Sequence, residues 1–127
     1  MVNKIVVVIA DDDPQISRLV KFKLEKEGYS IFLGENGQEA LDLIREVTPD
    51  IVILDVMMPV MDGFEVLREL KSEQVTAGIP AIMLTAREME EDVLKGFDLG
   101  AVDYMTKPFS PSELAARVNA NLNCKLG

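Results

Sequence analysis

Five short apolar runs alternate with segments of helical periodicity along this chain, and the alternation limits the possible folds more than any other feature. The runs span residues 4–10, 29–33, 51–55, 81–85 and 101–106. The first is apolar at consecutive positions, as is typical of a parallel strand buried on both faces. Strand–helix units repeated at this length require right-handed crossovers and a parallel sheet covered by helices on both sides. The sequence therefore predicts an α/β fold.

The segments between and after the runs carry helix signals. Apolar residues recur at helical spacing within residues 14–24, 36–47, 64–70, 88–99 and 110–122. Asp13 before Pro14 reads as an N-cap followed by proline at the first helical position. Ser110 and Glu113 have the spacing of a capping box at the start of the last helix. Residues 56–63 contain a proline and a glycine, so we expect them to form a loop.

Composition excludes several classes of function. The 127 residues suit one domain, and 22 acidic against 13 basic residues give a formal charge of -9, which argues against direct binding of nucleic acid or an anionic membrane. The chain has no histidine and a single cysteine, so histidine-dependent catalysis, His-rich zinc sites and an internal disulfide are excluded. The sequence reads directly into a strand without a signal peptide, and no apolar run approaches the ~20 residues of a membrane span. We therefore expect a cytoplasmic protein.

Polar side chains follow four of the predicted strands. They are Asp11, Asp12 and Asp13 after the first strand, Asp55 at the end of the third, Thr85 at the end of the fourth and Lys107 after the fifth. The carboxyl ends of parallel strands meet at one edge of the sheet, where ligands bind in open α/β proteins. Converging carboxylates repel one another unless a cation or a shared proton neutralises them. The aspartates therefore predict a site for a hard divalent metal ion.

Each of these residues also has a simpler explanation when it is taken alone. Helix capping or solvation accounts for a single aspartate at a strand end, and a β-branched residue such as Thr85 fills a strand. Lys107 alone could be a surface lysine. We assign Asp13 to the cap of the following helix, which leaves Asp11 and Asp12 as the metal ligands of the first strand. The placement of all these groups at the ends of different strands favours one common site.

Asp55 can act as a metal ligand and also as the group that reacts. A carboxylate held beside Mg²⁺ can attack a phosphoryl donor and become an aspartyl phosphate. That product carries added charge and acceptor oxygens, so it needs a hydroxyl and a cation as partners. Thr85 and Lys107 supply these two groups.

The chain resembles the response-regulator receiver domains of bacterial two-component signalling. The matching segments are residues 10–14, 55–63, 84–87 and 100–109, which occur in family order and span nearly the whole chain. The resemblance implies a flavodoxin-like receiver fold, a doubly wound five-stranded parallel sheet in the order 2-1-3-4-5 with five helices. It also implies one receiver domain over residues 1–127, either a stand-alone regulator or part of a longer one with a C-terminal output domain.

The resemblance implies a role for each site residue. Asp55 would be the phosphoacceptor and would ligate Mg²⁺ together with Asp12. Met57 would offer its backbone carbonyl to the metal, and Asp11 would act largely through water. No other cofactor is expected.

Further roles concern the response to phosphorylation. Thr85 would bond the phosphoryl group, Lys107 would pair with it, and a cis peptide before Pro108 would aim the lysine into the site. The small residue Ala86 would leave room for phosphate. Thr85 and Tyr104 would be the switch residues, with the threonine moving toward the phosphate and the ring turning inward behind it.

The resemblance also implies partners. A sensor histidine kinase or a phosphotransfer protein would donate the phosphoryl group, and the domain would be a phosphoacceptor with weak Mg²⁺-dependent self-phosphorylation and self-dephosphorylation rather than an enzyme. The last segment resembles the subgroup that carries a winged-helix DNA-binding domain. Active domains of that subgroup dimerise through the fourth helix, the fifth strand and the fifth helix. Asp103, Glu113 and Arg117 fit its charge pairs.

Two other functions compete with a signalling switch. A Mg²⁺-dependent phosphohydrolase of the haloacid-dehalogenase type would use Asp11 as nucleophile and Asp13 as general acid, since that family has Asp-x-Asp after its first strand. Pro14 and Gln15 depart from its pattern, and the chain leaves no room for a substrate cap. A flavin- or nucleotide-binding module of doubly wound fold would need a phosphate-binding loop, and neither Gly-x-Gly-x-x-Gly nor Gly-Lys-Ser/Thr is present.

Overall fold

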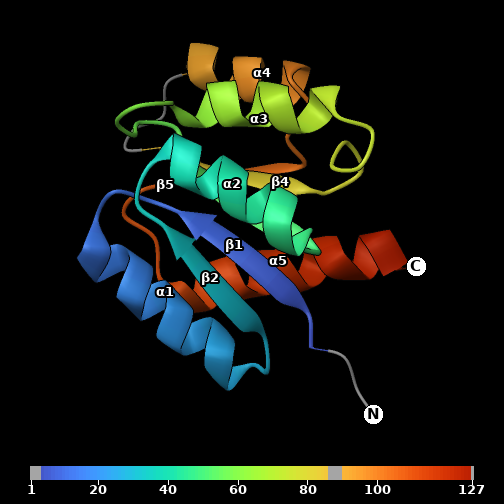
Figure 1. Cartoon of the computed structure of the whole chain (residues 1–127). Coiled ribbons are helices and arrows are strands. Elements are labelled where there is room, and N and C mark those ends of the chain that lie inside the picture. The colour runs from blue at the N-terminus through green and yellow to red at the C-terminus, as the bar shows by residue number, and fades with distance from the viewer. Residues whose placement is uncertain (1–3, 86–89, 127) are drawn as a thin grey trace.

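The computed structural model describes residues 4–85 and 90–126, and within them strands and helices alternate as the sequence predicts (Figure 1). The elements are β1 (Val6–Ala10), α1 (Pro14–Lys26), β2 (Ser30–Gly34), α2 (Gly37–Val47), β3 (Ile51–Asp55), α3 (Gly63–Ser72), β4 (Ala81–Thr85), α4 (Glu90–Asp98), β5 (Asp103–Thr106) and α5 (Pro111–Leu126). Among the described residues, no helix combines the length and the apolar character that crossing a membrane requires.

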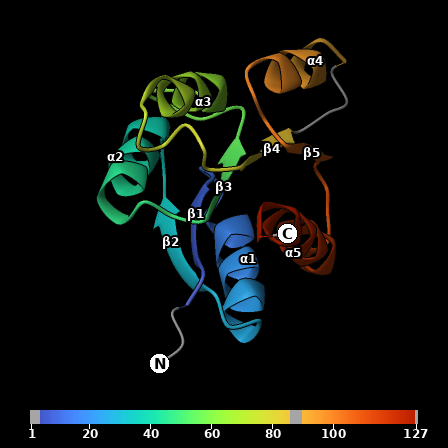
Figure 2. The ribbon, with the colours of Figure 1, turned by 90° about the vertical axis from the view of Figure 1, so that its right-hand side faces the viewer.

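The five strands form one parallel sheet in the order β2-β1-β3-β4-β5. Helices α1 and α5 cover one face of the sheet, and α2, α3 and α4 lie on the other (Figure 2). The α/β prediction and the strand order 2-1-3-4-5 are therefore confirmed.

The apolar runs are continuous because both faces of the central strands are buried. Val7 and Ile9 of β1 pack into the core shared with α1 and α5, whereas Val8 and Ala10 pack into the core shared with α2 and α3. All residues of β3 are buried. Because side chains on both faces are buried, each central strand ends where its apolar residues end. The polar residues that follow are therefore placed at the carboxyl edge of the sheet.

Side-chain caps set where several helices begin. Asp13 accepts hydrogen bonds from the backbone N–H groups of Gln15 and Ile16, as the sequence predicts. Asp62 and Glu65 form a reciprocal capping box at the start of α3. These caps satisfy N–H groups that have no partner within the helix, and they fix the loops that carry the site.

Several predicted boundaries differ from the structure. The strands β3 and β4 have the predicted bounds, whereas β1 begins two residues later than predicted and β2 is shifted by one residue. The strand β5 begins at Asp103 rather than at residue 101, because the N–H of Ala101 bonds to the carbonyl of Gly96 and still belongs to the end of α4. The helix α4 is described from Glu90 to Asp98, and residues 88 and 89 of the predicted helix lie outside the described part of the chain.

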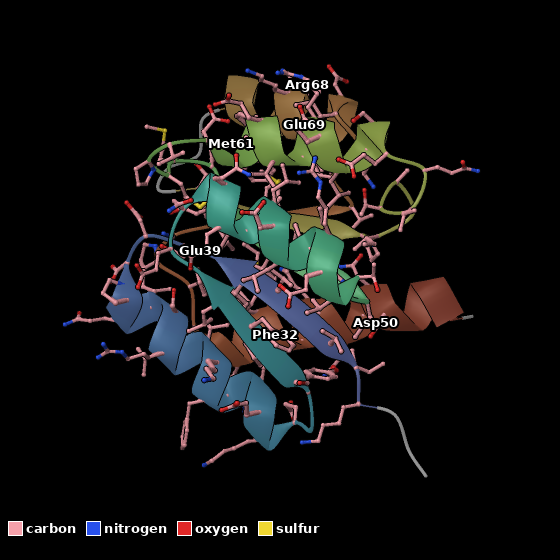
Figure 3. The ribbon with its side chains drawn as sticks, in the orientation of Figure 1. Phe32, Glu39, Asp50, Met61, Arg68 and Glu69 are labelled. Carbon is pink, nitrogen blue, oxygen red and sulfur yellow. The ribbon has the colours of Figure 1, made fainter. Side chains whose placement is uncertain are left out.

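Two contacts hold the loops on either side of β3. Before β3, the carboxylate of Asp50 accepts the N–H of Val6 at 2.8 Å, and the N–H of Asp50 donates to the carbonyl of Val6 at 2.8 Å (Figure 3). After β3, Met61 lies beside the N-terminal end of α2 (Figure 3). A Cβ atom on Gly37 would overlap the carbonyl group of Met61. Only glycine therefore permits this approach of α2 to the loop after β3.

Candidate acidic site at the carboxyl edge of the sheet

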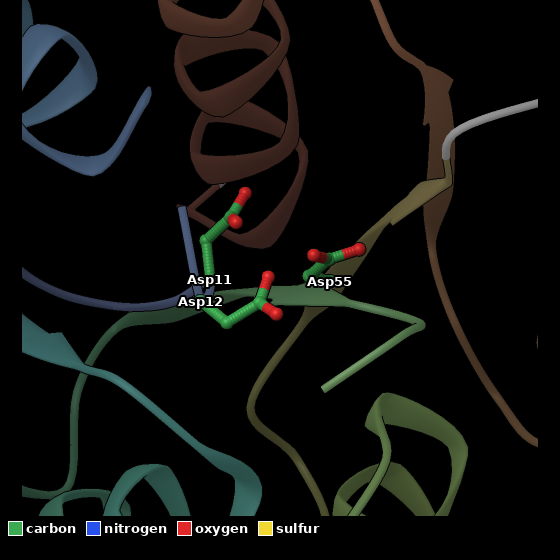
Figure 4. A group of neighbouring side chains, drawn as sticks. All are labelled: Asp11, Asp12 and Asp55. Carbon is green, nitrogen blue, oxygen red and sulfur yellow. The ribbon is translucent and has the colours of Figure 1, made fainter. Parts of the chain in front are cut away.

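Three aspartates converge at the carboxyl ends of β1 and β3. One carboxylate oxygen from each of Asp11, Asp12 and Asp55 lies within 4.8 Å of the others (Figure 4). Asp11 and Asp55 are buried, with exposures of 2% and 4%, whereas Asp12 is exposed. The predicted convergence of these residues is confirmed, because β1 and β3 are parallel neighbours and end at the same level.

Lys107 brings a positive charge to the same place. Its Nζ lies 2.9 Å from Asp11 Oδ2 and 3.1 Å from Asp55 Oδ2. The lysine follows β5, and its backbone N–H donates to the carbonyl of Thr85. The peptide bond to Pro108 is cis, as predicted. One ammonium group thus contacts two buried carboxylates from different strands.

The surroundings of Asp55 disfavour the ionised form of its carboxyl group. Burial, together with the negative charge of Asp11, raises the pKa of Asp55 from 3.8 to about 6. The charge and hydrogen bond of Lys107 and the N–H of Met57 act in the opposite direction but do not cancel this rise. Burial lowers the pKa of Lys107, but its hydrogen bond to Asp11 and the charges of Asp55 and Asp11 outweigh burial and raise the pKa overall.

The three consecutive aspartates have different environments. Asp11 turns into the site and accepts the N–H of Asp13 through Oδ1 at 2.9 Å. Asp13 uses its own carboxylate to cap α1 and is not one of the three clustered residues. A phosphohydrolase of the Asp-x-Asp type would need both Asp11 and Asp13 at its reaction centre. The geometry of the described residues therefore disfavours that alternative.

The loop after β3 forms one side of the site. The N–H of Met57 points to Asp55 Oδ1 at 3.4 Å, and the side chain of Met57 is exposed. The role of the Met57 carbonyl as a metal ligand stays a prediction. Gly63 lies directly against the backbone of Asp55, where a Cβ atom would overlap the carbonyl oxygen and come within 2.9 Å of the carbonyl carbon. This contact is not visible in the sequence, although a glycine that closes such a loop is a hint of close approach.

Val60 in the same loop has a backbone conformation that suits glycine better. Its φ is 72°, and its side chain is 79% exposed. A β-branched residue in the left-handed region is strained by about 1–2 kcal/mol, and exposure gives no packing in return.

We expect Val60→Gly to raise the unfolding free energy by about 0.5–1 kcal/mol, because the relief of strain exceeds the entropy cost of glycine. Urea unfolding of the two proteins measures the difference. Val60→Ala is the matched control, since it removes the side chain but keeps a Cβ atom, and it should give a smaller gain. A decrease in stability for Val60→Gly would show that the loop is not strained.

The two predicted switch residues lie on neighbouring strands. Thr85 is the last residue of β4 and is buried. Tyr104 of β5 is half-buried, and its ring centroid is 6.3 Å from that of Phe97 on α4. Ala86, predicted to leave room for phosphate, lies outside the described residues.

The predicted dimer charges pair within one chain in this structure. Arg117 Nη1 lies 2.8 Å from Asp103 Oδ1, and Arg117 Nη2 lies 3.8 Å from Glu113. Asn121, which the sequence did not single out, also donates to Asp103. Their role in a dimer stays a prediction.

The fold and the site together define a flavodoxin-like α/β domain with an acidic site at its carboxyl edge. The family model of the response regulator receiver domain matches residues 7–119. The chain therefore belongs to the response regulator receiver domain family, as its sequence motifs indicate. The further resemblance to the winged-helix subgroup stays a prediction.

Solved structures of receiver domains are similar to this chain over nearly its whole length. The receiver domain of a Francisella response regulator is 36% identical, covers 96% of this chain and 99% of its own, and has a TM-score of 0.88. The chemotaxis protein CheY4 of Vibrio cholerae is 30% identical, with coverage of 93% and 98% and a TM-score of 0.88. The signal receiver domain of a histidine kinase from Syntrophus aciditrophicus is 36% identical, with coverage of 93% and 89% and a TM-score of 0.84.

The family defines the general function of the domain. Receiver domains act in two-component signalling, interact with histidine kinases or phosphotransfer proteins, and generally bind Mg²⁺ at an acidic pocket. The cluster of Asp11, Asp12 and Asp55 fits such an ion, because its donors are all carboxylate oxygens and Mg²⁺ prefers hard oxygen ligands with several positions left for water. The exposed Asp12 leaves one side of the cluster open to solvent.

Proposed function

We propose that this domain is a phosphorylation-dependent switch in which Asp55 accepts a phosphoryl group from a histidine kinase or a phosphotransfer protein. The observation that carries the proposal is the convergence of Asp55 with two further carboxylates and with Lys107 at one edge of the sheet. Burial of Asp55 keeps bulk water from its carboxylate. A cavity of about 420 Å³ lies beside the aspartate cluster and is lined in part by Asp11, Asp12 and Arg18.

The metal site would be built by Asp12, Asp55 and the backbone carbonyl of Met57, with Asp11 acting largely through water. Mg²⁺ supplies charge neutralisation, so that an anionic carboxylate and an anionic phosphoryl group can approach each other. Burial, and after it the negative charge of Asp11, raises the pKa of Asp55, so the anionic form of Asp55 is disfavoured in the absence of a metal ion. The site is therefore poised to bind a cation.

The chain's own residues would carry the transfer. An Oδ atom of Asp55 attacks the phosphorus, a new P–O bond forms, and the P–N bond to the donor imidazole breaks with its electron pair staying on the nitrogen. Lys107, already 3.1 Å from Asp55 Oδ2, would pair with an oxygen of the transferred group. The hydroxyl of Thr85, at the end of the adjacent strand, would donate to another oxygen.

The output would be a shift between two packings. Movement of Thr85 toward the phosphoryl group leaves room behind it on β4, and Tyr104 of β5 responds because the two strands are paired. The face formed by α4, β5 and α5 would then change its affinity for partners or for a second copy. Asp103, Glu113 and Arg117 lie on that face, and a dimer would require some of their pairs within the chain to be exchanged. Such a protein is a phosphoacceptor with weak self-catalysis rather than an enzyme.

The proposal is tested by intact mass measurement after incubation with acetyl phosphate and Mg²⁺. We expect the wild type to gain the mass of one phosphoryl group, sensitive to hydroxylamine, and Asp55→Asn to gain none, because an amide is not a nucleophile toward phosphorus. Asp42→Asn is the matched control, since Asp42 is exposed on α2 and should leave the adduct unchanged.

Two results would contradict the proposal. One is an adduct of equal yield on Asp55→Asn, which would place the acceptor elsewhere. The other is turnover of a phosphomonoester that Asp11→Asn abolishes and Asp55→Asn does not, which would favour the phosphohydrolase.

A further inference from the structure

The helix α4 carries a notch at Gly96 that receives the ring of Tyr104. A Cβ atom at position 96 would lie 2.7 Å from Tyr104 Cε2 and 3.2 Å from Cδ2. Carbon atoms in van der Waals contact are about 3.5–4.0 Å apart, so a methyl group and the ring cannot occupy these positions together. The ring therefore rests against the backbone of α4 itself.

The residues beside Gly96 strengthen this attachment. The ring of Phe97 is tilted by 48° to that of Tyr104, and Lys95 Nζ lies 4.8 Å from the centroid of the Phe64 ring on α3. Three consecutive residues of α4 thus contact β5 and α3. Figure 2 shows α4 beside the β4–β5 side of the sheet. The position of the Tyr104 ring and the position of α4 are consequently coupled.

Glycine is otherwise a poor choice at this place. Inside a helix it is less favourable than alanine, because it loses more backbone freedom on folding. Gly96 has no φ in the left-handed region, so its backbone conformation does not require glycine. The contact with Tyr104 is the feature of the described residues that does require it.

We propose that Gly96 is a positioning residue of the switch, because the space left by its missing side chain is the seat that the Tyr104 ring occupies in one of the two packings. The proposal rests on the phosphorylation switch proposed above. A methyl group at position 96 closes the seat, so the ring stays outside whether or not Asp55 carries a phosphoryl group. We expect the chemistry at Asp55 to be retained, because the three atoms nearest to a Cβ on Gly96 belong to Tyr104 and Phe64 and none belongs to the clustered carboxylates.

The ring can be followed directly, because the chain has two tyrosines and no tryptophan. Fluorotyrosine labelling should give two ¹⁹F resonances, and Tyr29→Phe assigns the one that belongs to Tyr104. In the wild type, we expect acetyl phosphate with Mg²⁺ to shift the Tyr104 resonance in step with the mass adduct. In Gly96→Ala, we expect the adduct at a yield within about twofold, a Tyr104 resonance already displaced, and no further shift.

A second measurement tests the contact without phosphorylation. The change from Gly96 to alanine should lower the urea midpoint when Tyr104 is present and raise it in the Tyr104→Ala background, where only the helix preference for alanine remains. Asp98→Ala is the control for helix preference, because Asp98 is exposed on the same helix. A merely structural role of Gly96 would lower the midpoint in both backgrounds.

The outcomes separate the two proposals. A Gly96→Ala protein that takes up the phosphoryl group and shifts its Tyr104 resonance as the wild type does would overturn the role of Gly96 and leave the switch intact. A wild type without an adduct would overturn the proposed function and the regulatory role together. If Gly96→Ala changed the urea midpoint equally in the protein with Tyr104 and in the Tyr104→Ala protein, the proposal that the Tyr104 ring occupies the space at Gly96 would be wrong.

Discussion

In a metal-free buffer at about pH 7, Asp55→Asn should be more stable than the wild type by about 3 kcal/mol, whereas the two proteins should be about equally stable near pH 4. The carboxyl group of Asp55 has a pKa of about 6 in the folded protein, raised from 3.8 by burial and by the charge of Asp11. Its anionic form is therefore unfavourable in the native state. Asparagine has the same shape and carries no charge, so it removes this cost.

The sign follows from proton binding. Because the pKa is higher in the folded state, the folded protein holds this proton more tightly than the unfolded chain does. The stabilisation is fully present below about pH 4 and is lost as the pH rises through about 6. Other groups give the wild type a pH profile of their own, so the quantity to compare is the difference between the two proteins. Urea unfolding at several pH values, with a chelator present, measures it.

At neutral pH, Mg²⁺ should reduce the difference in unfolding free energy between Asp55→Asn and the wild type. An ion that binds only the folded state adds about 2.7 kcal/mol at a free concentration about 100 times its Kd, and loss of the Asp55 charge weakens its site in the variant. Asp42→Asn serves as the control with the same chemical change on an exposed helix face. If the difference in unfolding free energy between Asp55→Asn and the wild type stayed constant from pH 4 to 7, the ionised form of Asp55 would not be disfavoured in the folded protein.

The sequence predicted the central strands and the cluster of aspartates because single physical rules decide both. β3 is buried on both faces, so its apolar run has sharp ends, and Asp55 necessarily falls at the edge of the sheet. The role of Asp13 can be distinguished from those of Asp11 and Asp12 because Pro14 follows Asp13 and marks the start of the helix. Where local sequence signals agree with the tertiary structure, the bounds of the strands and the positions of the site residues can be predicted from the sequence.

Other features depend on contacts between distant segments and could not be read in this way. Strands that are apolar on both faces show no alternation of polar and apolar residues, so periodicity predicts neither the register nor the strand order. The strand order was predicted from the family resemblance. The start of β5 was misplaced because Ala101 completes the end of α4. The sharing of Lys107 between Asp11 and Asp55 requires the lysine to cross from β5, which no spacing reveals. The pairing of Arg117 with Asp103 is a similar case.

Gly63→Ala should lower the unfolding free energy by about 3 kcal/mol, at the upper end of the cost of overpacking, and should reduce phosphorylation of Asp55 as well. A Cβ atom there would overlap the carbonyl oxygen of Asp55 and lie 3.0 Å from Val56 Cα. All three nearest atoms belong to the backbone, so no flexible side chain can move aside. The N–H of Gly63 also bonds to the carbonyl of Val56 at 2.9 Å, which holds the loop where the clash occurs.

The matched control is Gly78→Ala, because a Cβ atom on Gly78 meets no atom within 4 Å and its φ is not in the left-handed region. That variant should be stabilised by about 0.4–1 kcal/mol, since alanine restricts the unfolded chain more than glycine does. Urea unfolding compares the three proteins, and intact mass after acetyl phosphate treatment reports on the site. If Gly63→Ala matched the wild type in both measurements, the backbone of Asp55 would be able to move aside, and the rigid positioning of the proposed acceptor carboxylate would be disproved. If it lost stability but kept the full yield of adduct, the loop would serve folding alone. Because Gly63 contacts the main chain of Asp55, the proposed phosphoacceptor, we expect the unfolding free energy and the yield of phosphorylation to fall together.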